Sequence, residues 1–173
     1  MPVASSRALP IAYVVLRILI VLNWLMGAAI LAVLVASTNE QWILDALKLD
    51  PSLDPERLLT AVRAICVLGI AVVPLNRIIL NRLVAIVETV RAGDPFVAAN
   101  ATRLQAIAWT LLALQLLGIV IGAIAESVST PAYPLHLDAG FSINGWLAVL
   151  LTFLLARVFA EGTHMREDLE GVV

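Results

Sequence analysis

Four long apolar segments constrain this chain more than any other feature of its sequence. They cover residues 11–36, 58–80, 104–125 and 143–160, and each is at least 18 residues long. About 20 helical residues, each rising 1.5 Å, cross a hydrocarbon core roughly 30 Å thick. We therefore predict an all-α integral membrane protein, in which four transmembrane helices form an antiparallel bundle.

The composition points the same way. Hydrophobic residues make up 61% of the chain and charged residues 14%, whereas soluble domains carry about 25% charged residues. We expect a single membrane domain over residues 1–173, with a cytoplasmic loop over 81–103 and a cytoplasmic tail over 161–173. The first segment exceeds the 7–15 apolar residues that are usual in a signal peptide, so we expect it to be retained.

The distribution of basic residues predicts the orientation, because short cytoplasmic loops are enriched in lysine and arginine. The segment 126–140 contains neither residue. Four arginines lie between the second and third spans or at their ends: Arg77, Arg82, Arg91 and Arg103. We therefore expect both chain ends to face the cytoplasm, with the other two connections on the outer side.

Helix-terminating signals refine these boundaries. The Asp-Pro-Glu sequence at 54–56 predicts the start of the second helix, and Gly93 predicts its end. About 38 residues lie between them, or roughly 57 Å of helix. Such a helix either projects into the cytoplasm or bends at Pro74. We expect Asn100 and Ser142 to cap the third and fourth helices.

Polar side chains inside membrane spans are candidate functional residues. Arg17, Arg63 and Arg157 lie within about two turns of a span end, so their long side chains can reach the lipid headgroups. We interpret all three as lipid-headgroup anchors. Binding of a partner is the alternative.

A second set of residues fits contacts between helices. Asn23 and Gln115 lie deep in their spans, where an interhelical hydrogen bond contributes on the order of 1 kcal/mol. Gly27 shares a face with Asn23, while Gly118 and Gly122 form a GxxxG pattern that lets helices approach closely. The alternatives are a substrate or ion path beside the two amides and a homodimer through the glycines.

Enzyme chemistry has little support in the sequence. The two histidines, His136 and His164, fall on opposite sides of the predicted membrane and cannot both ligate one haem. Cys66 is the single cysteine, and no nucleophile elbow, P-loop or HExxH motif is present. We expect no enzyme activity, no cofactor, no metal site and no direct binding of nucleic acid.

Two stretches carry a family resemblance. One is Ala-Gly-Asp-Pro-Phe at 92–96, followed by Asn100 and Arg103, and the other is the tail with Phe159, Gly162 and Met-Arg-Glu at 165–167. Together they resemble the YoaS-like family of small four-span bacterial membrane proteins with a domain of unknown function. The resemblance implies a bacterial cytoplasmic membrane, a frequent pairing with a small helix-turn-helix regulator, and no catalytic residues.

Three hypotheses for function follow. The first is a regulatory or adaptor protein whose cytoplasmic face binds a soluble partner. The residues predicted for that face are Arg77, Arg82, Arg91, Asp94, Phe96 and Arg103. The second is an accessory subunit of a larger membrane complex. The third is a small transporter or lipid-binding protein that uses Asn23 and Gln115.

Overall fold

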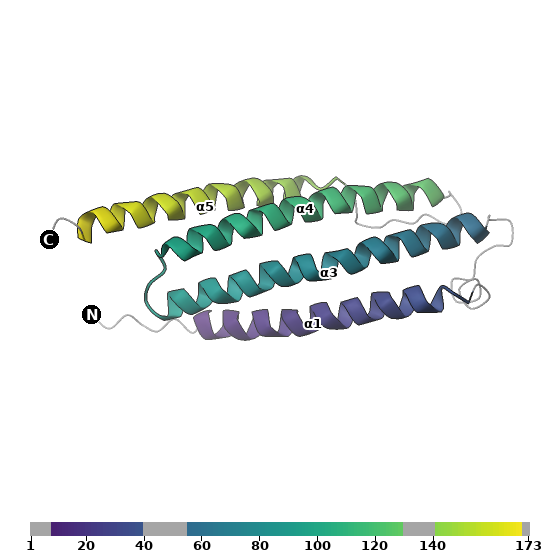
Figure 1. The fold of residues 1–173 in the computed structure, drawn as a ribbon, viewed down its shortest axis with the longest axis horizontal. Helices are drawn as coiled ribbons and strands as arrows, with labels where there is room; N and C mark the ends of the chain where they lie inside the picture. Colours follow the sequence, from purple (N-terminus) through teal and green to yellow (C-terminus); the bar gives the residue numbers. More distant parts are fainter. Residues whose placement is uncertain (1–7, 40–54, 130–140, 171–173) are drawn as a thin grey trace.

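The computed structural model describes residues 8–39, 55–129 and 141–170, and these form four long helices. The helices are α1 (Ala8–Ala36), α3 (Pro55–Arg91), α4 (Ala98–Val128) and α5 (Ile143–Glu170). Each is long and apolar enough to cross a membrane, and no strand occurs in the described ranges. Successive helices run in opposite directions, so the start of α1 and the end of α5 lie at the same end of the molecule (Figure 1). The prediction of an all-α protein with four membrane-spanning helices is confirmed.

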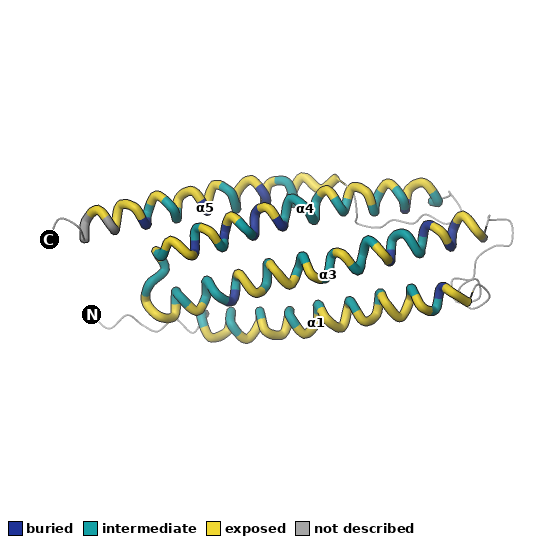
Figure 2. The backbone as a smooth tube through the Cα atoms, in the orientation of Figure 1, coloured by how far each residue is buried: buried dark blue, intermediate teal, exposed yellow. Residues whose placement is uncertain are grey.

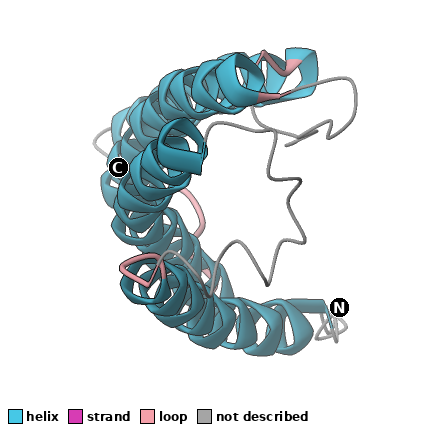
Figure 3. Cartoon of the chain, turned by 90° about the vertical axis from the view of Figure 1, so that its right-hand side faces the viewer, coloured by secondary structure: helices cyan, strands magenta, loops and turns pink. Residues whose placement is uncertain are grey.

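The helices pack as an open, curved row. Most contacts between helices join α1 to α3, α3 to α4, and α4 to α5, which are neighbours along the chain. Viewed along the helix axes, the described helices follow an arc and do not close into a ring (Figure 3). Consequently α3 and α4 each have a helix on both sides, whereas α1 and α5 form the two edges.

The surface of this row suits hydrocarbon better than water. Most of the described residues are exposed or half-buried, and the most apolar stretch of α1 contains no buried residue (Figure 2). Among the described residues, a small buried cluster consists of Leu104, Ile107 and Ala156. A soluble protein could not leave so much apolar surface in water. In a bilayer, lipid tails cover the same surface without cost.

The α1–α3 contact uses the small and polar residues that the sequence singled out. The Asn23 side chain donates a hydrogen bond to the backbone oxygen of Val73, 3.0 Å away. A Cβ atom on Gly27 would lie 3.1 Å from the Val73 methyl groups, so the two helices approach closely here. Gly69 faces Ile30 in the same way, one turn along α3.

Two of the helix boundaries agree with the sequence. Helix α3 begins at Pro55 and runs as one helix of 37 residues with Pro74 inside it, or about 56 Å. It therefore reaches well beyond a hydrocarbon core of about 30 Å. Ser142 caps α5, because its hydroxyl accepts a hydrogen bond from the Gly145 N–H at 3.2 Å.

The predicted cap of α4 was wrong. Helix α4 begins at Ala98, and its N-cap residue, Val97, makes no side-chain hydrogen bond. Asn100 lies inside the first turn and is fully buried. Its amide makes hydrogen bonds to α3 and to the α3–α4 turn, a use that local spacing does not reveal.

Helix α5 is displaced along α4. The Gln115 side chain donates to the backbone oxygen of Ser142, the cap of α5, at 3.2 Å. Helix α4 continues for another 13 residues to Val128, so it extends about 20 Å beyond the start of α5. Gly118 lies in this extension, and among the described residues no side chain or neighbouring helix comes within 4 Å of where its Cβ would be.

Candidate functional site

The turn between α3 and α4 begins with a hydrogen-bonded C-terminal cap of α3. Gly93 adopts a φ of 87°, in the left-handed region that favours glycine. The Gly93 N–H donates to Val90 O and the Asp94 N–H donates to Thr89 O, both at 3.1 Å. These two bonds form a Schellman motif, which satisfies carbonyls at the end of α3. The chain then enters Pro95 and the first turn of α4.

Asn100 joins three parts of this turn. Its Nδ2 donates to the Thr89 hydroxyl at 2.7 Å and to the Pro95 carbonyl at 2.8 Å. Its Oδ1 accepts from the Arg103 guanidinium at 2.8 Å, and the same guanidinium nitrogen donates to Ala85 O at 3.2 Å. Because Asn100 has no exposed surface, each of these bonds replaces a bond to water. The amide therefore holds the end of α3 against the start of α4.

Helix α5 packs against the same turn. The Phe96 ring lies 5.4 Å from the Phe159 ring, measured between centroids. A Cβ on Gly162 would lie 3.2 Å from Phe96, so the small residue makes room for the ring. One turn further on, the Arg166 guanidinium forms an ion pair with the Asp94 carboxylate. Residues far apart in the sequence thus form one surface at the end of the row.

Several predicted partner-binding residues are used inside the molecule. Arg103 bonds to Asn100 and Ala85, as described above. The guanidinium of Arg77 lies 5.0 Å from the centroid of the Trp24 ring, and that of Arg91 lies 5.4 Å from the Tyr13 ring. Such cation–π contacts tie α3 to α1. Among the described residues, Arg82 is the arginine of the predicted set that makes neither a hydrogen bond nor a cation–π contact within the molecule.

The predicted headgroup anchors differ from one another. Arg63 on α3 donates to Ser37 O, just after the end of α1, at 2.7 Å. Arg17 donates to the hydroxyl of Tyr13 on its own helix at 2.8 Å. Arg157 is exposed on α5 and lines a groove described below.

A related bond of Arg57 was missed from the sequence. Its guanidinium donates to Ser127 O at 3.0 Å, near the end of α4. A basic side chain at a helix C-terminus satisfies a free carbonyl and interacts favourably with the helix dipole. Through Arg57 and Arg63, the start of α3 therefore holds the ends of both neighbouring helices. No local sequence signal identifies such partners.

The chemistry gathered at the turn is structural. An amide, a hydroxyl, two aromatic rings and an ion pair fix the positions of three helix ends. Within residues 8–39, 55–129 and 141–170, no group of three or more histidine, cysteine or acidic side chains could hold a metal. The arrangement provides a rigid surface with polar and aromatic groups.

The described helices define the class of this protein, a small four-helix protein whose helices are long and apolar enough to span a membrane. The family model described as a protein of unknown function, DUF2975, matches residues 36–173, and the chain belongs to this family. Neither the curated proteins nor the solved structures gave a significant match. The family model carries no functional description, and the narrower YoaS-like name stays a prediction.

Proposed function

We propose that this chain is a non-enzymatic regulatory or adaptor protein of the bacterial inner membrane, and that its cytoplasmic face binds a soluble protein. The four apolar helices support the membrane class. The family is one of unknown function, so membership of it does not indicate what the protein does. The arginines around the α3–α4 turn favour a cytoplasmic position for that end. The YoaS-like resemblance suggests a small helix-turn-helix regulator as the partner.

The partly exposed ring of Phe96 is the observation that carries this proposal. The residue is 45% exposed although Phe159 and Gly162 contact its ring. Met165, on the adjoining turn of α5, is 57% exposed. A fixed aromatic ring beside an exposed apolar side chain is typical of the centre of a protein–protein interface.

Charged groups next to this ring fit the rim of such an interface. Asp94 and Arg166 form an ion pair, and both side chains are nearly half exposed. The buried bonds of Asn100 hold the turn in one shape before any partner arrives. A surface that is already ordered loses little entropy on binding, which favours recognition.

Co-purification from membranes tests the proposal. The variant Met165→Glu places a charge on the proposed surface, and Arg82→Glu reverses an exposed charge at the same end; neither side chain makes a contact described above. We expect each variant to lose a soluble regulator that mass spectrometry identifies with the wild-type protein. Phe141→Ala, an exposed aromatic residue at the other end of α5, is the matched control and should keep the partner. Retention of the regulator by both charged variants would contradict the proposal.

A role as an accessory subunit is the second candidate, and α1 favours it. Among the described helices, α3 is the one that α1 packs against extensively. Apolar side chains are exposed along the length of α1. Such an edge could pack against the spans of another membrane protein. Purification in a mild detergent distinguishes the two roles. Comigration with a large membrane assembly supports the subunit, whereas a monomer or dimer that retains a soluble regulator supports the adaptor.

A further inference from the structure

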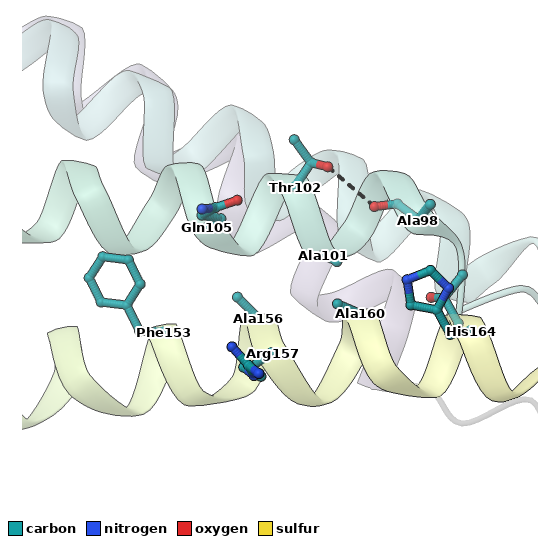
Figure 4. Close-up of a pocket in the computed structure, with 10 residues that line it drawn as sticks. Ala98, Ala101, Thr102, Gln105, Phe153, Ala156, Arg157, Ala160 and His164 are labelled. Carbon is teal, nitrogen blue, oxygen red and sulfur yellow. Dashed lines mark hydrogen bonds between the residues drawn. The ribbon is translucent and has the colours of Figure 1, made fainter.

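A groove of about 540 Å³ lies between the start of α4 and the middle of α5 (Figure 4). Its volume falls within the range of about 300–1,000 Å³ that is typical of ligand sites. Small side chains from both helices leave this space open. The alanines that line it are Ala98, Ala101, Ala156 and Ala160.

Polar side chains line one part of this groove. They include the Arg157 guanidinium from α5 and the Gln105 amide from α4. Within the described part of the chain, neither group has a hydrogen-bond or ion-pair partner. The Thr102 hydroxyl next to them makes only a long bond of 3.4 Å to Ala98 O (Figure 4). The groove therefore offers one positive charge and further donors to a ligand.

The other end of the groove is aromatic. Phe153 lines it, and the Trp109 ring meets Phe153 edge-on with 5.2 Å between centroids. Trp109 is 57% exposed. Beyond this pair, Leu116 on α4 and Leu150 on α5 are also more than half exposed. Leu150 lies seven residues before Arg157, so both are on one face of α5. An apolar track thus continues from the polar part of the groove.

The position of the groove along α4 matches the boundary of a membrane. Residues 106–125 of α4 contain no charged side chain, and their 20 residues span about 30 Å. This equals the thickness of a hydrocarbon core, so Gln105 lies at its edge. Exposed tryptophan is enriched at this depth, which agrees with Trp109 one turn further in.

We propose that this groove binds one anionic phospholipid from the leaflet at this end of the molecule. The phosphate lies against Arg157 and Gln105, and an acyl chain covers Phe153 and Trp109. A guanidinium recognises phosphate through paired, charge-assisted hydrogen bonds. The separation of polar and apolar groups along the groove selects an amphiphile over a free anion. Glu161, one turn from Arg157, does not line the groove. The proposal does not depend on a soluble partner.

Native mass spectrometry of the full chain in mild detergent tests this site. The probes are phosphatidylglycerol and phosphatidylcholine with identical acyl chains. We expect the wild-type protein to bind phosphatidylglycerol more tightly. Arg157→Gln should weaken that binding about tenfold, as the loss of a charge-assisted hydrogen bond predicts. Glu161→Gln, which removes a neighbouring charge of opposite sign, should retain the preference. Equal binding of the two lipids, or unchanged binding to the Arg157 variant, would overturn the proposal.

A second variant tests the groove without altering charge. Ala160→Leu fills the space between the helices, so it should abolish the preference for phosphatidylglycerol while Arg157 remains. Circular dichroism and the thermal midpoint of each variant show whether the fold is kept. Inorganic phosphate in millimolar excess should not displace the lipid, because it leaves the apolar track empty. Displacement by phosphate, or undiminished lipid binding by a folded Ala160→Leu protein, would exclude a phospholipid site.

Discussion

Asn100 on α4 donates a hydrogen bond to the hydroxyl of Thr89 on α3, with 2.7 Å between the two atoms. Asn100→Ala removes this donor, the donor to Pro95 O and the acceptor of Arg103. Buried groups that lose their partners cost about 1–3 kcal/mol in total stability. We expect the thermal midpoint in detergent to fall by about 4–8 °C, as a loss near 2 kcal/mol implies.

Thr102→Ala is the matched control for this prediction. Thr102 is exposed in the same helical turn and makes one long hydrogen bond of 3.4 Å. Surface changes of this kind alter stability by about 0.5 kcal/mol or less. Equal midpoints for the Asn100 and Thr102 variants would show that the buried amide does not stabilise the turn.

Gly93 predicts a graded response to substitution. Its φ is 87°, and in the described part of the chain no residue other than its chain neighbours lies within 4 Å of a Cβ at this position, so backbone strain opposes a side chain. Alanine should cost about 1–2 kcal/mol in the left-handed conformation. Asparagine tolerates this conformation better and should cost less. Chemical unfolding should therefore rank stability as Gly93, then Gly93→Asn, then Gly93→Ala, and the reverse order of the two variants would contradict this.

Gly145 and Gln115 should show strong energetic coupling. A Cβ on Gly145 would lie 1.9 Å from Gln115 Nε2, so Gly145→Ala forces that amide away from Ser142 O. The same change in a Gln115→Ala background meets no such atom and gains up to about 1 kcal/mol of helix propensity. A double-mutant cycle measures the difference. Gly118→Ala meets no other helix among the described residues, so it should be neutral or stabilising on its own.

The expected orientation is open to a direct test. Alkaline phosphatase fused after Asp138 should be active, because the enzyme folds only on the outer side of the membrane. Fusion after Val173 should give an inactive enzyme, and a fluorescent reporter at the same position should be bright. The opposite pattern would place the α3–α4 turn outside and remove the basis for a cytoplasmic partner.

Local sequence signals predicted helix ends well where one residue acts on its own helix. Pro55 begins α3 and Ser142 caps α5, since proline fixes its own φ and serine reaches the next turn. The same reasoning failed for Asn100, whose amide serves another helix. Whether a side chain hydrogen-bonds to its own helix or to a neighbouring helix depends on how the helices align. The spacing of residues along the chain does not predict that alignment.

The arginines show the same limit at the candidate site. The sequence shows how many arginines lie between the second and third spans. It does not show that Arg77 and Arg91 lie over aromatic rings of α1. Nor does the sequence show that Asp94 pairs with Arg166 on α5. Each of these contacts joins residues of different helices or turns. Which residues meet depends on how the antiparallel helices align over their whole length.

Each main contact in the row joins two successive described helices. This order bears on how the helices assemble during synthesis of the protein. A membrane protein is synthesised from its N-terminus, so α1 is in place when α3 arrives, and α3 when α4 arrives. Every new helix finds its neighbour already present and need not wait for a later one. Because the main pairings among the described helices all join successive helices, assembly can follow the order of translation.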